Sequence, residues 1–168
     1  HETNTIGNLK IDSARERIKK LNPNINLSTF SKRITSENAL EIIREFDVIC
    51  DCSDNFATRY LINDACLILN KPLVFGSVQG FEGQVSVFNL QKASPNLRDL
   101  LPESPSQNAV PSCAEYGVIG VSTGLIGILQ VNEIIKIILK KGEILDGKIL
   151  IFNLFNMNMK KLHLKSDQ

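Results

Sequence analysis

The fold of this chain is decided by Asp51-Cys52-Ser53-Asp54-Asn55-Phe56-Ala57-Thr58-Arg59-Tyr60 and by the segments on either side of it. The run Phe46-Asp47-Val48-Ile49-Cys50 comes before it and is typical of a short buried strand. After it, apolar residues recur at helical spacing from Phe56 to Ile68. The polar cluster therefore lies where a strand ends and a helix begins, which is the edge at which parallel sheets bind ligands.

Helix capping is the alternative role for this cluster. Ser53, Asp54 and Asn55 all have side chains that accept the free backbone N–H groups of a first helical turn. On spacing alone, capping is the simpler interpretation. A cap needs no second motif, however, and here Gly76-Ser77-Val78-Gln79-Gly80-Phe81-Glu82-Gly83-Gln84-Val85 follows. The two motifs together are more specific than a cap.

The first half of the chain alternates between helix and strand patterns. We expect a helix over residues 11–21, a strand over 25–30, a helix over 36–46 with Ser36 as its cap, and a strand over 73–77. This alternation predicts a parallel sheet with crossover helices.

The second half changes its pattern after Gly83. Residues 84–90 alternate as an antiparallel strand does, and residues 91–112 form a long loop without periodicity. We expect a long apolar helix within 118–139, buried over most of its surface, and then closing strands at 148–154 and 157–164.

These patterns predict an α/β, Rossmann-like fold with three layers and a mixed sheet, parallel strands first and antiparallel strands after. We expect one domain over residues 1–168, with the parallel part in 1–81 and the antiparallel strands, crossing loop and long helix in 82–168. No G-x-G-x-x-G follows a strand, although nucleotide-binding domains of this class normally open with that loop. We therefore expect an N-terminally truncated fragment of a longer protein or, alternatively, a domain that never had the loop.

Charge and cysteine usage narrow the class of protein. The formal net charge is +1, with both signs interspersed, so neither nucleic acid nor an anionic membrane is expected as a partner. Cys50, Cys52 and Cys66 are predicted to be small buried apolar residues, and a reducing, cytoplasmic location fits them. Polar residues inside the long apolar segment, such as Gln130 and Glu133, favour a soluble helix over a membrane span.

Taken together, the motifs resemble the MoeB/ThiF family, relatives of the ubiquitin-activating enzymes. The family pattern is Asp-Cys-Thr/Ser-Asp-Asn-x-x-x-Arg, then Pro-Leu-Val-x-Gly, then Gly-Gln-Val/Ile-x-Val-Phe. The matching residues are 51–55 with Arg59, 72–76 and 83–88. The resemblance covers nearly the whole chain, but only the later part of the family's domain.

The resemblance implies ATP-dependent adenylation of the C-terminal glycine of a ubiquitin-like or sulfur-carrier protein by a homodimer. It implies that Asp54 engages Mg-ATP near the α-phosphate, a role suited to a carboxylate because Mg²⁺ prefers oxygen ligands. Asn55 would be a neighbouring nucleotide contact, and Lys10 would reach the phosphates. A cation at a helix N-terminus is otherwise unfavourable for the helix dipole. The fragment alone is expected to be inactive.

Arg59 and Cys113 each have two possible roles. Arg59 is expected to form an ion pair with Asp51 or Asp54, or else to meet a substrate carboxylate. Cys113 stands at the end of the long loop, before a helix whose N-terminus would favour the thiolate. Because a cysteine at this place is covalently active in some family members and dispensable in others, both a nucleophile and an inert thiol stay open.

The chain departs from the family at its zinc ligands. Asn96 and Asp99 stand where the first of two C-x-x-C pairs would fall, and the C-terminal residues 165–168 contain no cysteine. Since these side chains replace a thiolate pair poorly, we predict no zinc. Two other functions remain as alternatives: the noncatalytic adaptor half of a heterodimeric activating enzyme, and a nicotinamide-dependent oxidoreductase, which would need the glycine loop.

Overall fold

The computed structural model describes residues 2–105 and 117–165. They form two compact units, His1–Ile34 and Thr35–Gln168, and each is described by itself. The predicted division at residue 81 stays a prediction. In the first unit, a 3₁₀ turn η1 (Thr3–Thr5) precedes helix α1 (Lys10–Leu21). The Asn22 N–H closes α1 on the oxygen of Ile18, which confirms the predicted helix.

The predicted strand over residues 25–30 is wrong. This segment has no regular structure, and none of the described residues forms a ladder with it. Ile25 is 49% exposed and Phe30 is 47% exposed, so these apolar side chains are not part of a core. A strand needs a neighbour to bond its backbone groups, and an alternating sequence does not provide one.

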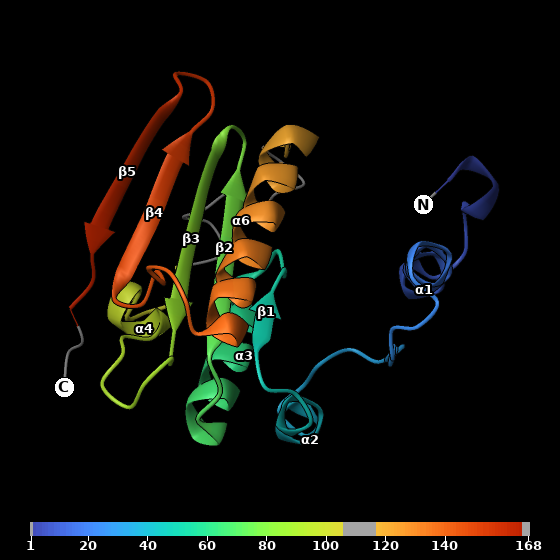
Figure 1. The fold of residues 1–168 in the computed structure, drawn as a ribbon, viewed down its shortest axis with the longest axis horizontal. Coiled ribbons are helices and arrows are strands. Elements are labelled where there is room, and N and C mark those ends of the chain that lie inside the picture. The colour runs from blue at the N-terminus through green and yellow to red at the C-terminus, as the bar shows by residue number, and fades with distance from the viewer. Residues whose placement is uncertain (1, 106–116, 166–168) are drawn as a thin grey trace. The chain divides into compact units, whose positions relative to one another are not determined.

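The second unit is built on one sheet of five strands, which lie side by side in chain order (Figure 1). They are β1 (Ile49–Asp51), β2 (Leu73–Gln79), β3 (Glu82–Phe88), β4 (Lys148–Asn153) and β5 (Asn158–His163). β1 and β2 are parallel, and every later pair is antiparallel. The mixed sheet is therefore confirmed, with a single parallel pair in the described residues.

Helices cover the two faces of this sheet. Helix α6 (Gly120–Leu139) packs on β2 and β3, where its Gln130 reaches the Val74 oxygen. Helix α3 (Phe56–Leu69) lies on the opposite face, because its Arg59 stacks over the Phe75 ring. Alternate residues of a strand point to opposite faces, so Val74 and Phe75 mark the two sides. The arrangement is the predicted three-layer order.

Two short helices extend the α3 layer. Helix α2 (Ala39–Arg44) packs against α3. Its cap is Asn38, two residues later than the predicted cap Ser36, and it ends at Arg44, two residues before the predicted end. The short helix α4 (Leu97–Leu100) lies inside the segment predicted to be loop. The Leu97 N–H donates a 2.9 Å hydrogen bond to the buried side chain of Asn63 in α3. That contact orders a segment whose own sequence has no periodicity.

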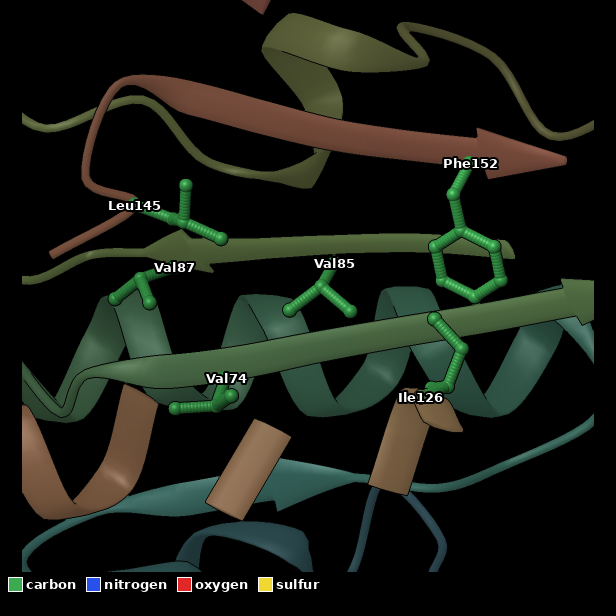
Figure 2. Packing of buried hydrophobic residues seen from close by; sticks show 6 residues of the cluster. All are labelled: Val74, Val85, Val87, Ile126, Leu145 and Phe152. Atoms are coloured by element: carbon green, nitrogen blue, oxygen red, sulfur yellow. The ribbon is translucent and has the colours of Figure 1, made fainter. Parts of the chain in front are cut away.

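The core between α6 and the sheet is apolar (Figure 2). Figure 2 labels its six buried residues, which come from β2, β3, β4, α6 and the turn before β4: Val74, Val85, Val87, Ile126, Leu145 and Phe152. Each fully buried side chain of this size stabilises the fold by roughly 1.5–3 kcal/mol. This core fixes β2, β3 and β4 relative to α6, and β1 is held by its pairing with β2, so the edge at which the polar cluster lies is fixed as well.

Two glycines let α6 approach the sheet. A Cβ atom on Gly76 would lie 2.5 Å from the side chain of Gln130, and one on Gly83 would lie 2.6 Å from Phe152 and 2.9 Å from Ile126. Distances this short leave no room for any side chain. The sequence motif that carries these glycines is therefore a packing requirement of the α6 face of the sheet.

The prediction that the long helix is buried over most of its surface is wrong. Only one stripe of α6 is buried: Ser122, Ile126, Gln130 and Glu133. Its remaining faces expose large apolar side chains by about half or more: Val121, Ile128, Val131, Ile135, Ile138 and Leu139. By length and composition α6 could cross a membrane, with 22% of its most apolar window buried, but one such helix is weak evidence for a span.

Candidate active site

The polar cluster forms the corner between β1 and α3. Asp51 ends β1 and is almost fully buried, with 1% of its surface exposed. Its Oδ1 accepts a 2.8 Å hydrogen bond from the Ser53 N–H, which turns the chain out of the strand. The other carboxylate oxygen, Oδ2, has no hydrogen-bond partner among the described residues. The corner is thus held by its own side chains.

Asn55, and not Asp54, is the cap of α3. Its backbone is extended, with φ −136° and ψ 147°, and its Oδ1 accepts a 2.9 Å hydrogen bond from the Thr58 N–H. The Asn55 amide nitrogen donates to Asp54 Oδ1 at 3.3 Å. Because Asn55 satisfies the helix end, Asp54 is left as an exposed carboxylate beside it. Capping and ligand binding therefore do not compete for the oxygens of Asp54.

Arg59 is a buried cation at the same corner. It is 8% exposed, and its guanidinium lies 5.5 Å from the Phe56 ring centroid and 5.7 Å from that of Phe75. Its Nη1 donates to Ser77 Oγ at 3.0 Å, and its Nη2 donates to the Ser53 oxygen at 3.2 Å.

The predicted ion pair of Arg59 with Asp51 or Asp54 is not found. None of the ion pairs in the described parts of the chain includes this guanidinium, and its Nε has no hydrogen-bond partner there. The reason is geometric: the buried rings and Ser77 draw the side chain along the sheet face. Its charge is uncompensated by any described carboxylate, which suits an anion at this edge of the sheet.

Gln130 is a residue of this corner that the sequence analysis did not assign to it. It is 3% exposed, and its Nε2 donates to the Asp51 oxygen at 2.8 Å and to the Val74 oxygen at 3.4 Å. It thereby ties the ends of β1 and β2 to α6. The one signal in the sequence is that Gln130 is a polar residue inside a long apolar segment.

Two thiols flank Asp51. The Sγ atoms of Cys50 and Cys52 are 3.8 Å apart, and Cys52 Sγ lies 3.9 Å from Gln130 Oε1. Cys66 is fully buried, as predicted, but Cys50 is half-buried and Cys52 is exposed, so the burial predicted for Cys52 is wrong. The hydrogen bond from Cys50 lowers the pKa of Cys52 to about 7 and raises the pKa of Cys50 itself.

Two predicted site residues, Lys10 and Cys113, are not placed at this corner by the structure. Lys10 is the first residue of α1 and is exposed. It belongs to the first compact unit, so its role beside Asp54 stays a prediction. Cys113 lies outside the described residues, and its two alternatives stay open.

Asn96 and Asp99, at the places of the family's zinc ligands, have another role here. Asn96 Oδ1 accepts the Arg98 N–H at 2.8 Å, and Asp99 Oδ2 accepts the Asn96 N–H at 2.7 Å. The two side chains form a reciprocal capping box at the start of α4. The absence of zinc stays a prediction.

The corner could supply some, but not all, of the oxygen ligands of a magnesium ion. Asp54 offers an exposed carboxylate, but no group of three or more His, Cys, Asp or Glu side chains gathers in the described residues. A Mg²⁺ ion here would take one carboxylate from this corner and its other oxygens from phosphate and water, as is usual for this ion. Chemically, the corner can hold a cation–phosphate group beside a buried guanidinium.

The sequence of this chain is similar to those of known proteins. The profile of the ThiF family matches residues 1–168. The chain is 44% identical over 165 residues to "Adenylyltransferase and sulfurtransferase MOCS3" of Culex quinquefasciatus, covering 98% of this chain and 37% of that protein. It is 43% identical over 166 residues to "Sulfur carrier protein adenylyltransferase" of Thermus thermophilus, covering 96% and 61%. The chain thus spans less than two thirds of the length of either relative.

Solved structures share the fold. Escherichia coli MccB in complex with MccA-N7isoASN matches with a TM-score of 0.84 at 13% identity, covering 99% of this chain and 52% of that one. MccB with ATP matches with a TM-score of 0.83 at 14% identity, with the same coverage. At this level of identity the likeness concerns the fold alone, and it confirms the predicted α/β architecture.

Proposed function

This chain belongs to the ThiF family, and we propose on that premise that the protein activates the C-terminal glycine of a small sulfur-carrier or ubiquitin-like protein by ATP-dependent adenylation. Its sequence relatives are named adenylyltransferases, one of them of a sulfur carrier protein. Their names supply the reaction class, and the β1–α3 corner supplies residues that suit it. The observation that carries the proposal is the exposed Asp54 carboxylate, freed from capping by Asn55.

In the proposed reaction, a carboxylate oxygen of the carrier's terminal glycine attacks the α-phosphorus of ATP. The bond from that phosphorus to the bridging oxygen breaks, and pyrophosphate leaves with the electron pair. Magnesium, when bound, would neutralise the negative charge of the phosphates, and Asp54 is the residue that would supply a protein oxygen to it. Catalysis of this kind rests on positioning and charge neutralisation more than on proton transfer.

Each residue of the proposed site has a separate role, which follows from its position. Asp54 is proposed to give an oxygen ligand to the cation. The side-chain amide of Asn55, which donates to Asp54 in this structure, is proposed to rotate and donate to the nucleotide instead. Arg59 offers its unpartnered Nε to an anion, either the attacking carboxylate or a phosphate oxygen. Lys10 is proposed to reach the phosphates from α1.

The proposal extends to partners and location. We propose a homodimer in the cytoplasm, with the carrier's tail passing the segment 91–112 on its way to the nucleotide. The exposed apolar faces of α6 support association with another chain. The proposal includes neither a nucleic acid nor a membrane partner.

Pyrophosphate exchange tests the function. The full-length gene product is given Mg-ATP, labelled pyrophosphate and its sulfur-carrier protein, and incorporation of label into ATP is measured. Label should enter ATP only when the carrier is present with its terminal glycine intact, because reversible adenylation needs that carboxylate. Removal of the last glycine is the matched control. No exchange above this control would overturn the proposal in favour of a noncatalytic adaptor half.

A further inference from the structure

Cys50 and Cys52 form a dithiol beside the proposed site. Their sulfur atoms are 3.8 Å apart, one thiol is exposed, and Cys52 is separated from Asp54 by a single residue. Residues two apart along a strand point to the same face, which brings the two sulfurs together. We propose that Cys50 and Cys52 are an oxidation site, at which peroxide closes the pair into a disulfide and reversibly switches off the β1–α3 corner.

The pair can close because only one partner is fixed. Cys50 lies within β1 and pairs with Val74, so its backbone is held in the ladder. Cys52 follows the last paired residue, Asp51, and its own backbone is outside the ladder. A disulfide needs an S–S distance of about 2.05 Å, so closure requires Cys52 to move towards Cys50. The exposed thiol is therefore the mobile one.

The resulting bond would be easy to reduce. Residues two apart in extended backbone lie about 6.6 Å apart between Cα atoms, at roughly 3.3 Å a residue. Disulfides usually bridge Cα atoms up to about 6.8 Å apart, so a bond across an extended spacing of this kind would be close to the upper limit and strained. Strained, exposed disulfides are the labile and regulatory ones. The site suits a reversible switch better than a permanent crosslink.

The chemistry consumes one hydrogen peroxide molecule. The Cys52 sulfur attacks one peroxide oxygen, the O–O bond breaks, and water leaves, which gives a sulfenic acid. The Cys50 sulfur then attacks the Cys52 sulfur, the S–O bond breaks, and a second water leaves as the S–S bond forms. Two thiols are oxidised by two electrons in all, and both oxygens of the peroxide end in water.

Formation of the Cys50–Cys52 disulfide would displace Asp54. The moving Cys52 sulfur leaves Gln130 Oε1, and the backbone that follows it carries the Asp51–Ser53 turn. Asp54 comes directly after that turn, so its carboxylate shifts with it. This consequence for activity rests on the proposed function; the disulfide itself does not.

Peptide mass measurement tests the bond directly. Trypsin cleavage after Arg44 and Arg59 yields one peptide, residues 45–59, that contains Cys50 and Cys52 and no other cysteine. After brief treatment with hydrogen peroxide and alkylation of free thiols, this peptide should appear unalkylated and lighter by two hydrogen atoms. Cys66, fully buried in α3, is the internal control and should stay a free thiol that is alkylated only after unfolding.

Three results would overturn the pairing: a Cys52 sulfinic acid in a peptide whose Cys50 is alkylated, a crosslink from this peptide to the one carrying Cys113, or no oxidation. In the Cys50→Ser variant the resolving thiol is gone, so peroxide should drive Cys52 to a state that dithiothreitol does not reverse. The Cys66→Ser variant should behave as the wild type.

Measuring pyrophosphate exchange before and after peroxide treatment tests the redox switch separately from the proposed function. Peroxide should lower pyrophosphate exchange by at least tenfold in the wild type, and dithiothreitol should restore it. In Cys50→Ser, exchange should start near the wild-type rate and be lost without recovery. Disulfide formation with unchanged exchange would overturn the switch alone, whereas exchange absent before any peroxide would overturn the proposed function and leave the mass result standing.

Discussion

The side-chain amide of Gln130 in α6 donates a 2.8 Å hydrogen bond to the main-chain oxygen of Asp51, the last residue of β1. This contact joins residues 79 positions apart in the chain. It exists because Gly76 leaves room for the amide, since a Cβ atom there would lie 2.5 Å from it. The helix, the strand end and the glycine therefore form one packing unit beneath the proposed site.

The first prediction is that Gly76 and Gln130 are energetically coupled. Gly76→Ala should destabilise the fold by about 1–3 kcal/mol, because the added methyl group overlaps the amide. In a Gln130→Ala background the same change should cost less, with a coupling of roughly 0.5–3 kcal/mol. Urea unfolding of the four proteins measures this. Additive effects would show that the contact does not exist in solution.

The second prediction concerns Asp54. Asp54→Ala should lower pyrophosphate exchange by on the order of 10²-fold or more, as expected on losing a group that neutralises transition-state charge. Stability should change little, because the side chain is exposed and does not cap α3. Asp47→Ala removes another exposed carboxylate close by in the sequence and is the control. Wild-type exchange by Asp54→Ala would remove Asp54 from the site.

A third prediction separates the two roles of Asn55. Asn55→Ala should destabilise the fold by about 1 kcal/mol through loss of the cap. Asn55→Asp keeps a capping oxygen, so its stability should return towards wild type. It also loses the amide donor and adds a charge beside Asp54, so its KM for ATP should rise. An unchanged KM in the folded Asn55→Asp variant would leave Asn55 a cap alone.

The fourth prediction is a pH dependence of stability. Arg98 Nε and Nη2 donate to Asp64 at 2.9 and 2.7 Å, and these hydrogen bonds hold the pKa of Asp64 below its usual value. A lowered folded-state pKa stabilises the fold above the unfolded value, and the contribution is lost as the pH falls through the folded value. Asp64→Asn should therefore cost under about 1 kcal/mol at pH 7, since the pair is partly exposed.

The same measurement near pH 3 gives the contrast. There the difference in unfolding free energy between wild type and Asp64→Asn should shrink, because the wild-type carboxyl is becoming protonated. A difference that grows on acidification would contradict the ion pair as its source.

The fifth prediction is that α6 mediates self-association. Ile128 and Ile135 are 68% and 48% exposed, on a helix whose buried stripe lies elsewhere. Ile128→Glu combined with Ile135→Glu should convert a dimer into a monomer of 18.7 kDa, measured by light scattering on the 168-residue chain. Phe155→Glu, which removes an exposed aromatic residue from the β4–β5 turn, should leave the dimer intact. A monomeric wild type would refute this prediction.

The sequence predicted what depends on local pattern. The strand-to-helix corner, the mixed sheet and the long helix all follow from the spacing of apolar residues, and the structure confirms them. The choice of cap did not follow, because Ser53, Asp54 and Asn55 are chemically equivalent for that role. Backbone geometry selects Asn55, the residue whose oxygen meets the Thr58 N–H.

What the sequence missed depends on distant partners. The segment predicted to be a strand at residues 25–30 has no strand neighbour in the described chain. Arg59 was expected to find a carboxylate nearby, but it meets Ser77, which is 18 residues away. Gln130 looked like a residue arguing against a membrane span, and its hydrogen bonds to Asp51 and Val74 appear only in three dimensions.

The fully exposed strand β5 also has a consequence for how the protein resists aggregation. All six of its residues are exposed, and it is one edge of the described sheet, so its outer backbone groups are open to another chain. Lys160 and Lys161 follow each other there, and neighbouring strand residues project to opposite faces. Lys161 Nζ lies 3.5 Å from Glu143 Oε1, so part of its charge is compensated within the chain. Lysines on an edge strand are a common protection against edge-to-edge pairing, and β5 carries two of them.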